Sequence, residues 1–548
     1  MRAFWIIITG FIIFSSCSAA DKSKLLWELA KENKETLTIS TLFMAKSVGE
    51  YLSTEEGINN AVEWCKKTGI THIYLETFRS RHTAEREVLE NAKSRFTAEG
   101  FDVSGCVTTT QIGKISTNWN LISCYTDEGT LNELQKIFEY TASIFDEIMI
   151  DDFYFTDCEC GECVKARGDK EWAEYRCDLM IDVSLERILK PARAVNPDVK
   201  IIIKYPNWYD HFHDRGYEVV RETDVYDKIW VGTETRDYDF STSEKGLVQY
   251  GAYFIMRWLG GIGGSKTGGG WFDALATTEN TYAEQARQLI LADVKEMFLF
   301  SYAGLNRETN NYAGRDGTGI ADIKKLRTEI PGLFRLASLV QNKPIKGIHL
   351  PKLPNSEGYD ERYVFGFVGM LGLPLVPSAD INTEAEAAFF SVHALKDPDF
   401  PAKLNKMLHE NKPVLITDGL AGRLKDINTN DENLMVLEIN GNPRSMLNLL
   451  REELKPLRNK LLAHLGIQFD APNYVSLYLI GDDLLVIENF NDKPVTAVLE
   501  FSTPVKVEEV PVVLPVNGTV DYTVNKEKVK FTGITPRTMA AIKYRLDN

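Results

Sequence analysis

The sequence predicts an α/β protein, with a (β/α)8 TIM barrel followed by a small α/β domain and a C-terminal β-sandwich. Short apolar runs alternate with helical patterns from Leu37 to Val340, as expected for parallel strands covered by helices. Eight such repeats over roughly 300 residues match the stoichiometry of a closed barrel. After about Gln341 the pattern changes, and from Asn473 alternating strands predict the sandwich.

The barrel strands are predicted at Leu37–Met44, His72–Phe78, Val103–Thr108, Glu147–Asp152, Lys200–Tyr205, Lys228–Thr233, Gly270–Ala274 and Glu296–Tyr302. The helices are predicted at Glu55–Lys67, Ala84–Ala98, Gly129–Ile144, Trp172–Ala194, Tyr217–Glu222, Gly246–Leu259, Tyr282–Asp293 and Ile320–Val340. An open doubly wound sheet is the alternative, but no Gly-x-Gly-x-x-Gly follows the first strand. The glycine cluster Gly260–Gly270 has no strand before it, so neither a phosphate loop nor an organic cofactor is expected.

The predicted domain boundaries are 18–340 for the barrel, 341–465 for the α/β domain and 466–548 for the sandwich. Strands of the α/β domain are expected at Ile345–Leu350, Leu371–Val376, Ala388–Phe390 and Pro413–Ile416, with helices at Phe400–Glu410 and Arg444–Leu465. This domain has neither a cysteine nor a glycine-flanked serine, so a role in packing or assembly is expected rather than chemistry.

The first residues predict export from the cytoplasm. Arg2 is followed by an apolar run, Phe4–Phe14, that is too short to span a bilayer. The segment ending in Ser15-Ser16-Cys17 resembles the lipobox of bacterial lipoproteins, which predicts a signal peptide over residues 1–17 and a lipid on Cys17. The expected location is the periplasm or outer-membrane surface of a Gram-negative bacterium, with the lipid as the sole membrane contact. Ordinary signal-peptide cleavage nearby is the alternative.

The formal charge of −16 argues against a nucleic-acid partner, because no segment supplies a cationic footprint.

Acidic, basic and aromatic residues follow the predicted strands, where a TIM barrel has its active site. They are Glu76, Arg79, Asn118, Trp119, Asp151, Asp152, Lys204, Trp208, Glu234, Arg236, Trp271, Asp273 and Tyr302. Sugar rings pack on aromatic rings, while their hydroxyls bind carboxylate, amide and guanidinium groups. This composition therefore predicts a carbohydrate site.

Glycosidic cleavage needs one protonated and one ionised carboxyl group, and the ends of the fourth, sixth and seventh strands supply candidates. Asp151 and Asp152 are successive strand residues that point to opposite sides, so one of them should face the barrel mouth. A cap or turn role is the alternative for a single aspartate. For Glu234 the alternative is a structural pair with Arg236.

Three cysteines, Cys158, Cys160 and Cys163, lie too close in the chain for all to form mutual disulfides, and they suit a tetrahedral zinc site that lacks one ligand. Cys124, Cys106 or Cys177 could be the fourth ligand. Disulfides in an oxidising compartment are the alternative. Four thiolates would make a closed, structural site that fixes the loop carrying the acids. His211 and His213 are expected on an exposed segment.

The stretch from Asp151-Asp152 through Phe153 to the C-x-C-x-x-C of Cys158–Cys163 resembles the fourth strand and loop of family 42 glycoside hydrolases, the β-galactosidases. This resemblance implies a zinc site whose fourth cysteine lies upstream, which favours Cys124 or Cys106. The domain order is also similar, which implies oligomerisation through a trimerisation-like α/β domain.

The departures from that family concern the catalytic residues. Asp151-Asp152 stands in place of Asn-Glu, so the resemblance implies that Asp152 is the acid/base and Asp151 its substrate-binding neighbour. Asp273 then stands in place of the glutamate nucleophile. The rival pairing joins Asp151 or Asp152 as nucleophile with Glu234 as acid/base, as in α-galactosidase-like barrels.

We therefore expect a distant relative of that family, a glycoside hydrolase that cleaves an oligosaccharide or a polysaccharide-derived glycoside by a two-carboxylate mechanism and whose sugar is different or unassigned. A carbohydrate-binding lipoprotein that kept the barrel and lost the acid pair is the alternative.

Overall fold

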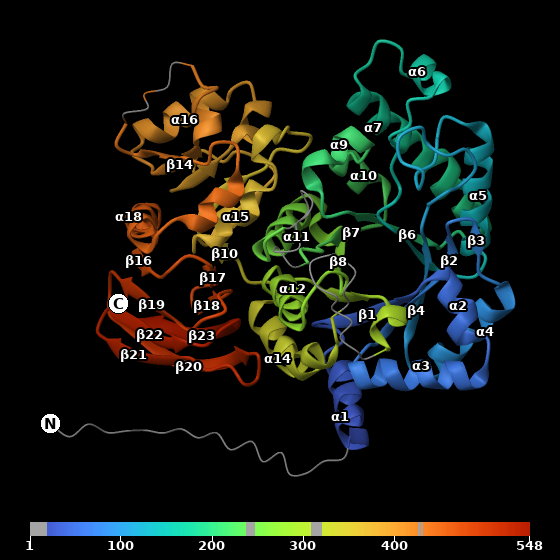
Figure 1. Cartoon of the computed structure of the whole chain (residues 1–548), viewed down its shortest axis with the longest axis horizontal. Coiled ribbons are helices and arrows are strands. Elements are labelled where there is room, and N and C mark those ends of the chain that lie inside the picture. Colours follow the sequence, from blue (N-terminus) through green and yellow to red (C-terminus); the bar gives the residue numbers. More distant parts are fainter. Residues whose placement is uncertain (1–18, 237–246, 308–320, 426–427, 429–430, 548) are drawn as a thin grey trace.

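The computed structural model describes residues 19–236, 247–307, 321–425, 428 and 431–547. The predicted signal segment and Cys17 lie outside these residues. Figure 1 shows three parts: a barrel, an α/β domain and a β-sandwich. No helix among the described residues has the length and apolar character needed to cross a membrane.

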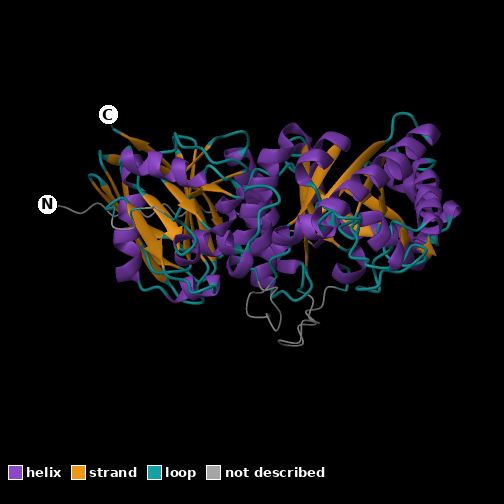
Figure 2. Ribbon diagram, turned by 90° about the horizontal axis from the view of Figure 1, so that it is seen from above, coloured by secondary structure: helices purple, strands orange, loops and turns teal. Residues whose placement is uncertain are grey.

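The barrel is a closed ring of eight parallel strands, because β1 pairs with both β2 and β9. The predicted TIM barrel is therefore confirmed, and Figure 2 shows helices around the strands. The strands are β1 (Thr38–Phe43), β2 (His72–Arg79), β4 (Asp102–Val107), β5 (Glu147–Ile150), β6 (Lys200–Tyr205), β7 (Lys228–Gly232), β8 (Thr267–Asp273) and β9 (Glu296–Phe300). A short β3 (His82–Thr83) extends β2 as an antiparallel hairpin.

Local signals mark both ends of the helix α3. In α3 the Thr54 side chain accepts a hydrogen bond from the N–H of Gly57, and Gly69 ends the helix with φ 69°. The barrel helices are α1 (Ala19–Glu32), α2 (Ala45–Leu52), α3 (Glu55–Thr68), α4 (Arg86–Ala98), α5 (Glu128–Ala142), α6 (Gly161–Arg167), α7 (Trp172–Val183), α8 (Lys190–Val195), α9 (Phe212–Arg215), α10 (Val219–Val225), α11 (Tyr250–Gly263), α12 (Glu279–Leu291), α13 (Tyr302–Leu305) and α14 (Lys324–Val340).

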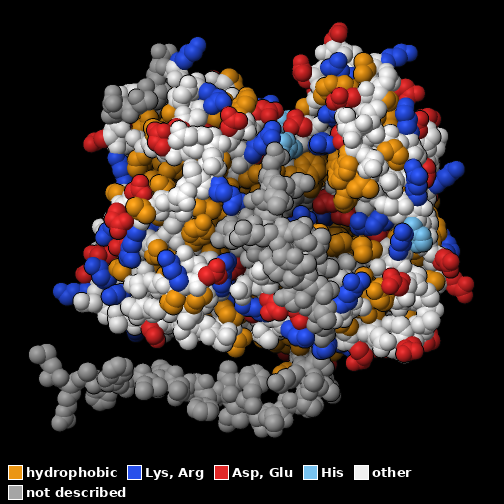
Figure 3. Space-filling view, in the orientation of Figure 1, with side chains coloured by type: hydrophobic (Ala, Val, Ile, Leu, Met, Phe, Trp, Pro, Cys, Tyr) orange, Lys and Arg blue, Asp and Glu red, His pale blue; other side chains and the backbone are white. Residues whose placement is uncertain are grey.

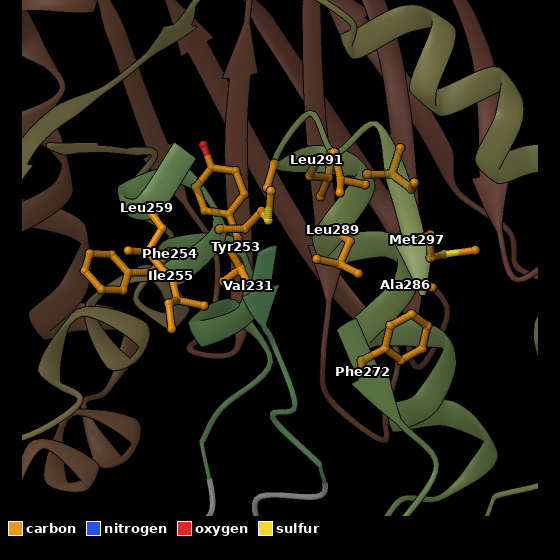
Figure 4. Close-up of a cluster of buried hydrophobic side chains, with 14 of the residues drawn as sticks. Val231, Tyr253, Phe254, Ile255, Leu259, Phe272, Ala286, Leu289, Leu291 and Met297 are labelled. Atoms are coloured by element: carbon orange, nitrogen blue, oxygen red, sulfur yellow. The ribbon is translucent and has the colours of Figure 1, made fainter. Parts of the chain in front are cut away.

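Apolar side chains fill the layer between the strands and the helices. Figure 4 shows Val231 and Phe272 on β7 and β8 beside Phe254 of α11 and Leu289 of α12. All four are buried and belong to one continuous core. This packing explains why the strands read as unbroken apolar runs, since helices cover their outer face.

The barrel interior contains the large indole of Trp230, which is 1% exposed. The glycines of β8 make room for it. A Cβ on Gly269 would lie 2.6 Å from the Trp230 ring and 2.6 Å from the carbonyl oxygen of Glu296. The glycine cluster that could have been mistaken for a phosphate loop therefore serves barrel packing.

The α/β domain has a parallel sheet ordered β12-β11-β13-β14-β15. Its strands are β11 (Ile348–Pro351), β12 (Leu375–Ser378), β13 (Ala388–Phe390), β14 (Val414–Thr417) and β15 (Leu434–Leu437), with helices α15 (Val364–Met370), α16 (Phe400–His409) and α17 (Asp418–Ala421). The helix α18 (Arg451–Leu461) follows and leads to the last part of the chain.

Two antiparallel sheets form the C-terminal part, in the orders β10-β17-β18-β23-β20 and β16-β19-β22-β21. Their strands are β10 (Ile345–Lys346), β16 (Ile467–Asp470), β17 (Val475–Ile480), β18 (Leu484–Asn489), β19 (Val495–Phe501), β20 (Val505–Leu514), β21 (Asp521–Asn525), β22 (Lys528–Ile534) and β23 (Thr538–Leu546). Two stacked sheets are consistent with the predicted β-sandwich. Strand β10 pairs with β17 in the first of these two sheets, although β10 precedes the α/β domain in the chain.

Candidate active site at the carboxyl ends of the barrel strands

Lys204 lies at the centre of a carboxylate cluster at the carboxyl ends of β5, β6 and β7. Its side chain is 1% exposed, and its Nζ donates to Asp151, Asp152 and Glu234 at 3.3, 2.9 and 3.2 Å. The ammonium group also lies 3.9 Å from the centre of the Trp271 ring. Three adjacent strands thus place three carboxylates around one buried cation.

Asp151 is held by hydrogen bonds on both carboxylate oxygens. Oδ2 accepts from Arg79 at 2.8 Å and lies 3.0 Å from the Thr108 hydroxyl oxygen, while Oδ1 accepts from the N–H of Asp152 at 2.8 Å. Burial alone would raise the pKa of Asp151, but the charges of Lys204 and Arg79 outweigh it and hold that pKa well below its usual range. Asp151 is therefore a fixed, ionised group.

Glu76 completes this fixed network. It is fully buried, and it accepts hydrogen bonds from Arg79 at 3.0 Å, from Thr108 at 2.5 Å and from the N–H of Ala45 at 2.7 Å. The network ties the ends of β2, β4 and β5 together.

Asp152 has fewer partners than its neighbour. Its Oδ2 accepts from Lys204, and 19% of its side chain is exposed. Burial raises the pKa of Asp152 to about 7, and the negative charges of Asp151 and Glu234 add to this shift against the attraction of Lys204. Two adjacent acids thus have opposite pKa shifts, as expected when one carboxyl group must hold a proton.

Glu234 is the carboxylate that faces Asp152 across Lys204. Its Oε1 contacts Lys204, whereas the buried Oε2 has no hydrogen-bond partner. Burial raises the pKa of Glu234, with a further contribution from Asp273. Because both carboxylates contact the same nitrogen, their nearest oxygens are at most about 6 Å apart, close to the spacing of a retaining glycosidase pair.

Asp273 lies at the end of β8 and is engaged elsewhere. Its Oδ2 accepts from Arg236 at 3.2 Å, and its Oδ1 accepts from the N–H of Leu275 at 3.1 Å. Gln285 holds this pair, because its amide donates to the carbonyl of Asp273 and accepts from the N–H of Thr235. The structure therefore pairs Arg236 with Asp273 rather than with Glu234.

The predicted sugar-binding aromatics occupy different environments. Trp119 is 40% exposed and lies near Phe153 and Phe155, and the Phe155 ring in turn contacts Trp208. Trp271 is 2% exposed and stacks on a barrel-interior ring, Phe298, at 4.0 Å.

Two other predicted substrate-binding residues are also engaged within the protein. Tyr302 is 4% exposed and packs against Phe43, Tyr51 and Trp64. Asn118 donates to the backbone carbonyl of Asp157.

The structure changes one prediction about the acids and adds two residues. Strand β5 ends at Ile150 rather than at Asp152, so the chain turns and both acids contact Lys204 instead of facing opposite sides. Thr108 and Gln285 were not among the predicted site residues. Thr108 ends a predicted strand and begins a run of three threonines, which was an available signal.

Four cysteines meet beside this site. The Sγ atoms of Cys124, Cys158, Cys160 and Cys163 lie within 4.8 Å of one another. Cys124 lies 3.5 Å from Cys163 and 3.8 Å from Cys160, near the roughly 3.8 Å between ligands of a tetrahedral zinc–thiolate site. The donor set therefore fits zinc.

The other two candidates for the fourth ligand lie elsewhere. Cys106 is in the barrel interior, and Cys177 contacts the carbonyl of His213.

The surroundings of Cys160 favour a thiolate, whereas the hydrogen bond with Cys163 raises the pKa of Cys124 and burial raises that of Cys158. Lys114 lies 3.4 Å from the Cys160 sulfur. Burial would raise the pKa of Cys160, but hydrogen bonds from the backbone N–H groups of Cys163 and Glu162 lower it to about 6. The cysteine loop is joined to the acids by the segment 153–157, in which Asp157 pairs with Arg215 at 2.7 Å.

The fold and this site define a TIM-barrel protein with a carboxylate cluster at its catalytic face. Residues 23–329, more than half of the 548, match the family model described as "Probable glycosyl hydrolase, catalytic domain", and the chain belongs to this family. An uncharacterised protein from Saccharolobus solfataricus is 27% identical over 371 residues. The match covers 60% of this chain and 58% of that relative's length.

One solved structure has a similar fold over nearly the whole chain. Alpha-L-fucosidase isoenzyme 2 from Paenibacillus thiaminolyticus aligns with a TM-score of 0.60, covering 93% of this chain and 99% of that one. The two sequences are 9% identical, so the similarity is one of fold.

Proposed function

We propose that the chain is a glycoside hydrolase that uses Asp152 and Glu234 as its catalytic pair. The observation that carries this proposal is their shared contact with Lys204, which holds the nearest oxygens of the two carboxyl groups at most about 6 Å apart. Family membership supports the activity. Asp273, the expected nucleophile, is the weaker candidate because Arg236 and the Leu275 N–H hold both of its oxygens.

In this proposal Asp152 is the proton donor. Its raised pKa keeps a proton available near neutral pH, and its partly exposed side chain can reach the leaving oxygen. The glycosidic carbon–oxygen bond breaks as that oxygen takes the proton from Asp152. Glu234 attacks the anomeric carbon through a carboxylate oxygen as the leaving group departs. Water, deprotonated by Asp152, then releases the sugar with its original anomeric configuration.

Asp151, Glu76 and Arg79 orient this pair without reacting. Asp151 is adjacent in sequence to Asp152 and accepts that residue's N–H, so a rigid Asp151 fixes the donor's backbone. Its permanent negative charge also raises the pKa of Asp152. Trp119 and Trp208 are proposed to line the sugar subsites. Trp119 is exposed, and both rings lie near Phe155, in the segment that follows Asp152.

A substrate screen tests the activity. Aryl α- and β-glycosides should include an α-L-fucoside, because a protein of similar fold is an α-L-fucosidase, and a β-galactoside, because of the resemblance to family 42. Turnover of any glycoside supports the proposal. Saturable glycan binding without turnover would instead favour a carbohydrate-binding protein.

Single substitutions test the pair. Asp152→Asn and Glu234→Gln should each lower kcat/KM by roughly 10³-fold or more, whereas Asp273→Asn should have a smaller effect. Azide should rescue Glu234→Ala and yield a glycosyl azide of inverted configuration. It should rescue Asp152→Ala only on substrates with good leaving groups. An inactive Asp273→Asn beside an active Glu234→Gln would overturn the pairing.

We also propose that Cys124, Cys158, Cys160 and Cys163 hold a structural zinc ion. In a four-thiolate site zinc has no free position, so its contribution would be to fix the loop after Asp152. The lipid anchor on Cys17, the location outside the cytoplasm and oligomerisation through the α/β domain are proposals that rest on the sequence.

A further inference from the structure

A cavity of about 700 Å³ lies between the barrel and the α/β domain, away from the carboxylate cluster. Its barrel side comes from α7, α9 and α10, and its other side comes from residues 355–359 and 392–396 of the α/β domain. In Figure 3 the molecule is hollowed at the top between two lobes, and charged side chains and histidine line the hollow.

His213, Asp214 and Glu357 converge at this cavity, with donor atoms within 4.8 Å of one another. The Nε2 of His213 lies 2.7 Å from Glu357 and 3.8 Å from Asp214. The sequence predicted an exposed segment here, but His213 is only 6% exposed and reaches Glu357 across 144 positions in the chain. That prediction is wrong for His213, which contacts Glu357 of the α/β domain, whereas the side chain of His211 is partly exposed.

We propose that His213, Asp214 and Glu357 bind a divalent transition-metal ion that clamps the barrel to the α/β domain. One imidazole nitrogen carries at most one proton, so it can donate to only one of the two carboxylates. A divalent cation would satisfy both carboxylates and the imidazole together. One nitrogen and two oxygen ligands suit Zn²⁺ or Mn²⁺ at about 2.0–2.2 Å, and the cavity leaves space for water at the remaining positions.

The barrel half of this site is fixed before any ion binds. Arg176 of α7 donates to the carbonyl of Asp214 at 2.8 Å, and Cys177 contacts the carbonyl of His213. His211 lies 3.4 Å from the second oxygen of Asp214 and would orient that carboxylate. Glu357 is half-exposed, so it is the ligand that can move to open the coordination shell.

The neighbouring cation on the barrel wall does not compete for these ligands. Arg221 pairs with Asp178 at 2.9 Å and with Glu218 at 3.4 Å. Glu174 extends the acidic wall without belonging to the cluster, which makes it a suitable control position.

Mn²⁺ titration of the full chain, followed by the electron paramagnetic resonance of free Mn²⁺, tests the site. Mn²⁺ prefers oxygen ligands and leaves the thiolate cluster aside. We expect one saturable Mn²⁺ per chain. Glu357→Gln should weaken binding at least about tenfold, while Glu174→Gln should leave it unchanged. Glu357→Gln should keep its fold, because the residue is half-exposed.

Thermal unfolding gives a second measurement. Mn²⁺ should raise the Tm of the wild-type protein more than that of Glu357→Gln. Absence of saturable binding would overturn the proposal. Binding that both Glu357→Gln and His213→Gln leave unchanged would overturn it as well.

Discussion

Lys204 connects three side chains whose sequence positions gave no hint of a common partner. A buried ammonium group is favourable only where carboxylates compensate for lost hydration, and Asp151, Asp152 and Glu234 do so here. The resulting cluster lowers the pKa of one aspartate and leaves that of the next raised to about 7. We therefore propose that Lys204 positions these carboxylates, while its predicted contact with a sugar stays a prediction.

Replacing Lys204 by Met should change both the rate and the pH dependence. In the wild type, kcat/KM should fall as pH rises above about 7, because Asp152 then loses its proton. Without the ammonium charge, ionised carboxyl groups are less stable, so the pKa of Asp152 rises and the alkaline limb moves to higher pH. We expect at least about a hundredfold loss of kcat/KM near neutral pH.

Lys204→Arg is the control for charge. Because it keeps the positive charge, its kcat/KM should fall at a pH closer to that of the wild-type protein than the kcat/KM of Lys204→Met does. Lys228→Met removes a half-exposed partner of Glu147 and should change neither kcat/KM near neutral pH nor its pH dependence. An unchanged pH profile in Lys204→Met would contradict the positioning role.

The glycines of strand β8 allow this strand to pack closely against Trp230 and the neighbouring strand β9. Gly269→Ala should destabilise the barrel by roughly 2 kcal/mol or more, because the new Cβ would overlap both Trp230 and the Glu296 carbonyl. Gly261→Ala in α11 has nothing within 4 Å and should be neutral or stabilising by up to about 1 kcal/mol. Denaturant unfolding of both variants measures the difference, and equal stabilities would contradict this account.

The cysteine loop offers a test that is independent of activity. Cys160→Ser should lower bound zinc from about one ion per chain toward zero, and it should lower the Tm, because metal binding stabilises only the folded state. Cys177→Ser is the matched control, since Cys177 is buried and contacts a backbone carbonyl outside the cluster. Elemental analysis decides the outcome. A wild-type protein without zinc would contradict the site.

Element types were predictable because covered parallel strands must be apolar and surface helices must be amphipathic. The directions of side chains at strand ends could not be predicted. Strand β5 ends at Ile150, and the turn that follows brings both Asp151 and Asp152 to Lys204. The partnership of Asp152 with Glu234 required the closed barrel, in which β5, β6 and β7 are neighbours. The environment of His213 required the domain packing, which no local pattern encodes.

At the scale of the whole molecule, buried ion pairs join the barrel to the sandwich. Arg287 of α12 binds Glu329 of α14 at 2.7 Å and Glu488 of β18 at 3.4 Å, and all three are buried. Gln288 donates to the same Glu488 at 2.6 Å. The barrel and the sandwich therefore share a buried polar network as well as a continuous apolar core.

Arg287→Met should lower the free energy of unfolding by roughly 3–5 kcal/mol, because it leaves two buried glutamates without their cation. Arg187→Met removes a surface pair with Glu128 and should cost less than about 1 kcal/mol. Calorimetry of both variants tests this, and the first should also separate the unfolding of the domains. Similar effects of the two substitutions would contradict the proposed contribution of the network.

The pairing of β10 with β17 gives the chain a nested order. After α14 the chain adds one strand to the sandwich, and it then leaves at Gly347, where a Cβ would lie 2.0 Å from the Pro374 carbonyl. It builds the whole α/β domain before returning at β16. The α/β domain is thus an insertion with both ends anchored in one sandwich, and its buried helix α15 also packs on α11 of the barrel.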